Sequence, residues 1–60
     1  MKRVDLIQQL ERAGCVLLWY DGKHDKFHQP RTGMSQPVPR HREIQERLER
    51  KILKELTADL

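Results

Sequence analysis

Residues 15–28 read Cys-Val-Leu-Leu-Trp-Tyr-Asp-Gly-Lys-His-Asp-Lys-Phe-His, and this stretch decides the fold. Its first six residues form an apolar run rich in strand formers, and the Asp21-Gly22 pair that follows is a strong hairpin signal. A second strand, residues 23–28, ends before Pro30, which cannot donate a hydrogen bond to a strand ladder. The pattern therefore predicts two antiparallel strands joined by a two-residue loop.

Amphipathic helices are predicted on either side of these strands. Residues 2–13 carry apolar side chains at helical spacing, and Gly14 follows where a left-handed C-terminal cap belongs. From residue 42 to about residue 56, one apolar stripe runs along an otherwise charged segment. Residues 34–38 form a short third strand, which Pro37 confines to an edge or a strand end. This order predicts an α+β fold, with a three-stranded antiparallel sheet covered on one face by two helices.

The length and charge of the chain limit its function. Sixty residues suffice for one small domain, residues 1–60, with a thin core and no deep substrate cavity. Residues 21–42 hold five bases, two acids and all three histidines, so the positive charge is concentrated in the middle of the chain. Such a stretch suits a polyanion such as nucleic acid, and a solvated basic loop is the alternative.

Several classes of protein are excluded by what the sequence lacks. Cys15 is the one cysteine, so neither an intrachain disulfide nor a thiolate metal site is expected. The longest apolar run is far shorter than the ~20 residues that span a bilayer, so we expect no membrane association and a cytoplasmic location. A glycine-rich phosphate loop, a nucleophilic serine motif and paired catalytic carboxylates are also missing.

The hairpin loop sets the two faces of the sheet. With a two-residue loop Tyr20 pairs with Lys23, whereas a three-residue loop would exchange the two faces of one strand relative to the other strand. The expected helix-covered face holds Val16, Leu18, Tyr20, Asp25 and Phe27. The expected open face holds Cys15, Leu17, Trp19, His24, Lys26 and His28.

The open face combines groups that suit RNA. An imidazole has an unperturbed pKa of about 6.5, so His24 can take the proton from a ribose 2′-OH at neutral pH, and attack on the adjacent phosphate needs no metal. Trp19 can stack on a base and Lys26 can contact phosphate. The alternatives are a surface histidine beside a turn and a partly buried core tryptophan. His24 and His28 are spaced too widely in a strand to share a metal ion comfortably.

A second basic cluster precedes the second helix. Residues 40–42 read Arg-His-Arg and suit phosphate contacts, the alternative being an ordinary solvated helix entry.

The chain resembles the HicA toxins of type II toxin–antitoxin systems, small ribonucleases that cut messenger RNA. The resemblance extends over nearly the whole chain, from Ala13-Gly14 through Gly22-Lys23-His24-Asp25 and Pro30 to Thr32-Gly33. It includes residues 36–44, Gln-Pro-Val-Pro-Arg-His-Arg-Glu-Ile, and a final helix. Many members carry serine where this chain has Lys23, and a basic or small residue where it has Asp21.

This resemblance implies a fold like that of double-stranded-RNA-binding domains, with His24 as the catalytic residue. It also implies a HicB-type antitoxin as partner, with DNA contacted only through that antitoxin. The leading hypothesis is a metal-independent endoribonuclease that needs no cofactor and leaves a 2′,3′-cyclic phosphate and a 5′-hydroxyl. The second proton-transfer role is left to His28, to water or to the RNA. The candidate RNA contacts are Trp19, Lys23, Lys26, His28, Arg40 and His41.

Two further functions are compatible with the same residues. A noncatalytic RNA-binding module would use the basic face to hold structured RNA by its shape. A protein-interaction domain would dock through the first helix or the sheet edge. A helix-turn-helix that reads DNA is disfavoured because strands separate the two helices.

Overall fold

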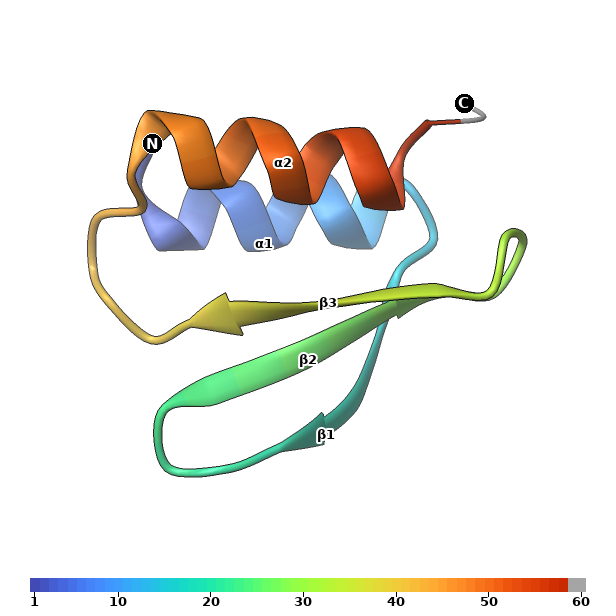
Figure 1. The fold of residues 1–60 in the computed structure, drawn as a ribbon, viewed down its shortest axis with the longest axis horizontal. Coiled ribbons are helices and arrows are strands. Elements are labelled where there is room, and N and C mark those ends of the chain that lie inside the picture. The colour runs from blue at the N-terminus through green and yellow to red at the C-terminus, as the bar shows by residue number, and fades with distance from the viewer. Residues whose placement is uncertain (59–60) are drawn as a thin grey trace.

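Two helices lie above a three-stranded antiparallel sheet in the computed structural model, which describes residues 1–58 (Figure 1). The strand order is β1-β2-β3, so β1 and β3 are the edges of the sheet. The predicted α+β architecture is confirmed, and the final two residues of the expected domain lie outside the described residues. In chain order the elements are α1 (Arg3–Arg12), β1 (Val16–Tyr20), β2 (His24–Gln29), β3 (Met34–Pro39) and α2 (Glu46–Leu56).

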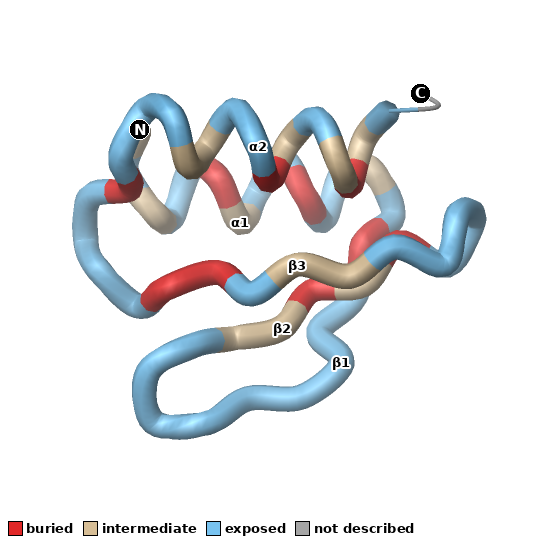
Figure 2. Tube along the Cα trace, viewed as in Figure 1, coloured by how far each residue is buried: buried red, intermediate tan, exposed pale blue. Residues whose placement is uncertain are grey.

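Facing stripes of the helices and one face of the sheet form the core. Leu6 and Leu10 of α1 are fully buried, as expected from their helical spacing. Gly14 has a φ of 90°, the left-handed conformation that ends a helix without strain in a residue that lacks Cβ. Figure 2 shows buried segments on the inner sides of both helices and along β2 and β3. The other buried apolar residues are Cys15, Phe27, Val38, Ile44, Ile52 and Leu56.

One buried amide joins the ends of three elements, α1, β2 and α2. The Gln29 side chain is 1% exposed, and its Nε2 donates to the Ala13 carbonyl at 2.9 Å and to the Leu56 carbonyl at 3.0 Å. Both acceptors lie at helix C-termini, where carbonyls lack partners within the helix. Gln29 therefore fastens the end of β2 to the ends of both helices.

The second helix begins four residues later than predicted, because residues 42–44 pair with the N-terminus. The Arg3 amide donates to the Arg42 carbonyl and the Ile44 amide donates to the Met1 carbonyl, each at 2.9 Å. Backbone groups committed to this pairing cannot take part in a helix. The basic segment before α2 is consequently not helical. Neither helix within residues 1–58 is long and apolar enough to cross a membrane.

The predicted two-residue hairpin loop is wrong. Tyr20 pairs with Asp25, so four residues, 21–24, separate the paired positions. The Asp21 carboxylate accepts hydrogen bonds from the backbone amides of Lys23 at 2.8 Å and His24 at 2.7 Å, which stabilises the wider turn. An irregularity between Leu17 and Trp19 shifts the register again further along β1.

The irregularity changes the predicted faces of β1, whereas the wider turn does not, because a loop longer by two residues keeps the alternation. Val16, Leu18 and Tyr20 are not covered by the helices, because every side chain of β1 is exposed (Figure 2). Leu17 pairs with buried Phe27 and so belongs to the helix side instead of the open face. Cys15 precedes the strand and is buried in the core. Thus β1 extends beyond the cover that the helices provide.

Candidate functional site

The open face of β2 carries the residues that alternation predicted. Because Phe27 and Gln29 are buried against the helices, His24, Lys26 and His28 lie on the opposite side of the strand. Trp19 pairs with Lys26 across the sheet, and the Lys26 ammonium lies 5.6 Å from the centroid of the Trp19 ring. At 48% exposure Trp19 is not a core residue, so its indole is available to stack on a ligand.

His24 and His41 line the same two hollows, at the end of the sheet where β2 begins and β3 ends. We call these the histidine hollows. The first, about 460 Å³, is also lined by Gly22, Lys23, Pro39 and Arg40. The second, about 380 Å³, extends from Pro37 and Pro39 to the start of α2. The structure thereby brings together four of the predicted site residues, namely Lys23, His24, Arg40 and His41.

The hairpin loop that carries His24 is held by Asp21. Its carboxylate accepts from two consecutive amides, and the hydrogen bonds from the Lys23 and then the His24 backbone lower the pKa of Asp21 below its usual value. The Lys23 carbonyl in turn accepts a hydrogen bond from the Arg40 amide at 3.2 Å. These contacts connect the loop of His24 to the segment of His41.

Asp25, in contrast, does not face the open side with His24. Its side chain is 14% exposed and forms ion pairs with Arg3 of α1 and with Arg40. Arg40 donates to one Asp25 oxygen from Nε at 3.0 Å and from Nη2 at 2.8 Å. The Arg40 guanidinium also lies 5.5 Å from the centroid of the Tyr20 ring. Arg40 is therefore held in a defined position at the border of the first hollow.

His28 lies apart from the histidine hollows. Four residues of extended strand separate it from His24, a distance of about 13 Å at ~3.3 Å per residue. Its Nδ1 lies 2.7 Å from the Ser35 hydroxyl of the neighbouring strand. His28 is thus too far from His24 for both imidazoles to contact the same phosphate.

The described residues contain one buried thiol and no candidate metal-binding cluster. Across residues 1–58, no group of three or more histidine, cysteine or acidic side chains is arranged to hold a metal ion. Burial raises the pKa of the Cys15 thiol, which lies 3.7 Å from the Leu56 carbonyl. A buried thiol with a raised pKa is a poor nucleophile.

Sequence reasoning missed a set of cations outside the open face. Lys2 and Arg3 lie beside Arg40 and Arg42, because the N-terminus pairs with the segment before α2. The N-terminal basic pair belongs to no motif, so only the pairing of residues 1–3 with residues 42–44 reveals this cluster.

The protein is a small α+β domain whose open sheet face carries imidazoles, cations and an indole. These residue types are the ones that contact polyanionic ligands. The family model described as the HicA toxin of bacterial toxin–antitoxin systems matches residues 4–57, nearly the whole chain and both histidine hollows. This chain belongs to the HicA toxin family. No curated protein and no solved structure matches it.

Proposed function

We propose that this HicA toxin is a metal-independent endoribonuclease that cuts messenger RNA in the cytoplasm and is neutralised by a HicB-type antitoxin. The observation that carries the proposal is that two imidazoles, His24 and His41, line the same two hollows, the first of which is also lined by Lys23 and Arg40. Cleavage next to a ribose 2′-OH needs one group to take a proton and another to give one, and imidazoles do both near neutral pH.

His24 is assigned as the base. It takes the proton from the 2′-OH, and the resulting oxygen attacks the adjacent phosphorus. His41, in its imidazolium form, donates a proton to the departing 5′-oxygen as the phosphorus–oxygen bond breaks. The products are a 2′,3′-cyclic phosphate and a 5′-hydroxyl, and no water is consumed. Lys23 stabilises the additional negative charge on the phosphate in the transition state.

The remainder of the open face is assigned to binding the RNA strand. Trp19 offers a surface for base stacking, worth ~1–3 kcal/mol per base in single-strand binding. Lys26 lies over that ring and carries the charge for a neighbouring phosphate. His28, farther along β2, contacts the RNA beyond the reacting phosphate.

The direct test is cleavage of a synthetic messenger RNA by purified protein in excess chelator. We expect wild type to leave 2′,3′-cyclic phosphate ends and His24→Ala to be slower by about 10²–10⁴-fold. His28→Ala, on the same strand, should weaken RNA binding but keep most of the rate at saturating RNA. Circular dichroism checks that the variants fold. Products with 3′-hydroxyl ends, or equal cleavage by His24→Ala, would contradict the proposal.

The alternative is a noncatalytic RNA-binding module, favoured by the exposed Trp19–Lys26 pair. In that case labelled RNA binds at ~150 mM salt, and wild type leaves it intact.

A further inference from the structure

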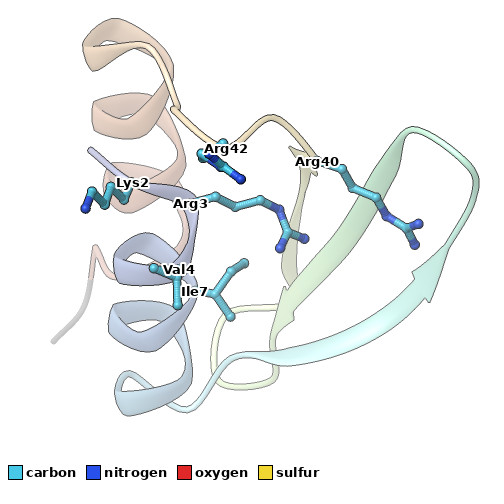
Figure 3. A pocket seen from close by; sticks show the side chains of 6 residues that line it. All are labelled: Lys2, Arg3, Val4, Ile7, Arg40 and Arg42. Atoms are coloured by element: carbon cyan, nitrogen blue, oxygen red, sulfur yellow. The ribbon is translucent and has the colours of Figure 1, made fainter.

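A basic groove lies beside α1, away from the open face of the sheet. It has a volume of about 610 Å³ and is lined by Lys2, Arg3, Val4, Ile7, Arg40 and Arg42 (Figure 3). In Figure 3 the Arg3 side chain extends from α1 toward the sheet, and the Arg40 side chain lies on the other side of the hollow. Cations and apolar side chains thus share one concave surface.

The charge of the basic groove is not balanced within the structure. Asp25 neutralises part of the charge of Arg3 and Arg40 by pairing with both. Among residues 1–58, no carboxylate lies within ion-pair distance of Lys2 or Arg42. An acidic ligand would therefore gain contacts there without displacing an existing partner.

The basic groove meets the exposed edge strand β1 at Arg40. Tyr20, 68% exposed, lies beneath the Arg40 guanidinium and connects the strand to the groove. Leu17 pairs with Phe27 and so lies on the same side of the sheet, yet it is 49% exposed. On the α1 side Val4 is 59% exposed. An apolar edge strand with one neighbouring strand offers free backbone groups to a further strand.

We propose that an extended acidic segment of the antitoxin binds here, pairing with β1 as a fourth strand and placing carboxylates against Lys2 and Arg42. This inference rests on the proposed function, in which an antitoxin is the protein partner. The exposed Val4 and Leu17 favour an extended peptide over RNA, because phosphates gain nothing from apolar contacts. A second copy of this chain is disfavoured, because pairing two β1 edges would bring two basic grooves together.

The test measures affinity for the antitoxin encoded by the neighbouring gene. His24→Ala serves as the parent protein, so that both chains can be produced without toxicity. Charge reversal in Lys2→Glu/Arg42→Glu and the edge variant Leu17→Asp should each weaken binding about tenfold or more in calorimetry. Lys51→Glu/Lys54→Glu, an equal charge change on exposed positions of α2, is the matched control and should stay within about threefold of the parent.

Hydrogen exchange of the complex tests the strand pairing. The amides of residues 16–20 that face away from β2 should become protected when the antitoxin binds. Unchanged exchange in β1, or unchanged affinity in the groove and edge variants, would overturn the inference, as would an antitoxin that does not bind the parent protein.

Binding of a labelled oligoribonucleotide to the same variants separates the two possible ligands. RNA affinity should fall no further in Lys2→Glu/Arg42→Glu than in the α2 control. A selective loss of RNA affinity with antitoxin affinity intact would make the basic groove an RNA subsite and overturn the inference. Cleavage by wild type is measured separately, so failure of the proposed nuclease function is distinguishable from failure of the docking surface.

Discussion

The histidine hollows and the basic groove both border Arg40, yet their charged groups are held differently. At the histidine hollows, His24 and His41 are exposed, and the structure gives neither imidazole a hydrogen bond to another side chain of residues 1–58. In the basic groove, Arg3 and Arg40 are fixed by a largely buried carboxylate. Exposed imidazoles can exchange protons with a ligand, whereas guanidinium groups held in place by ion pairs present a preorganised positively charged surface. The difference indicates that the first region suits chemistry and the second suits recognition.

Removing His41 should produce the largest effect. His41→Ala removes the proposed acid and should slow RNA cleavage by about 10²-fold or more. A uridine 3′-phosphodiester with a nitrophenol leaving group needs no acid, so His41→Ala should cleave it nearly as fast as wild type. An equal loss on both substrates would contradict the role of His41.

Removing Asp25 should affect both regions through Arg40. Asp25→Ala leaves two partly buried guanidinium groups without their partner, and we expect it to lower the free energy of unfolding by about 1–3 kcal/mol. Chemical denaturation measures this loss. The matched variant Glu46→Ala breaks the exposed Glu46–Arg50 pair and should cost at most ~0.5 kcal/mol. Similar losses in the two variants would mean that the Asp25 pairs are not structurally important.

Removing Asp21 should disturb the histidine hollows but not the basic groove. In Asp21→Ala the amides of Lys23 and His24 lose their acceptor, so their hydrogen exchange should quicken and RNA cleavage should fall by about tenfold or less. Antitoxin affinity should stay unchanged, which sharpens the comparison between the two regions.

The lowered pKa of Asp21 predicts how the protection of the Lys23 and His24 amides depends on pH. Because the folded pKa lies below the unfolded value of ~3.9, the contribution of the carboxylate is present above that pH and is lost as pH falls through the folded pKa. Amide exchange in wild type should therefore approach that of Asp21→Ala only in strong acid. Loss of protection near neutral pH would contradict this account.

The smallest effect is expected at the exposed edge. Leu17→Thr keeps a good strand former at a half-exposed position, so the free energy of unfolding should change by no more than ~0.5 kcal/mol. Thermal or chemical denaturation of the isolated protein checks this. A larger loss would mean that Leu17 is a core residue, and that the effect of Leu17→Asp on antitoxin binding reports stability.

The sequence correctly predicted the features that depend on the local periodicity of the side chains. Alternation along β2 placed His24, Lys26 and His28 on one face, and helical spacing identified the buried stripe of α1 with Gly14 behind it. The same reasoning failed at β1, because an irregularity between Leu17 and Trp19 moves Leu17 to the opposite face of the strand. The turn is also wider than predicted, since the Asp21 carboxylate accepts hydrogen bonds from the amides of Lys23 and His24. The start of α2 was predicted four residues too early, because residues 42–44 form backbone hydrogen bonds with the N-terminus.

The sequence by itself therefore determined the family, the order of the elements and the face that carries His24, because motifs and residue periods are local properties. Only the tertiary structure decided that His41 lines the hollows of His24, and that Arg42 joins Lys2 in the basic groove instead. His24 and Lys2 are both far in sequence from residues 41 and 42. The hydrogen bond from the Arg40 amide to the Lys23 carbonyl brings His41 beside His24, and the pairing of residues 1–3 with residues 42–44 brings Arg42 beside Lys2.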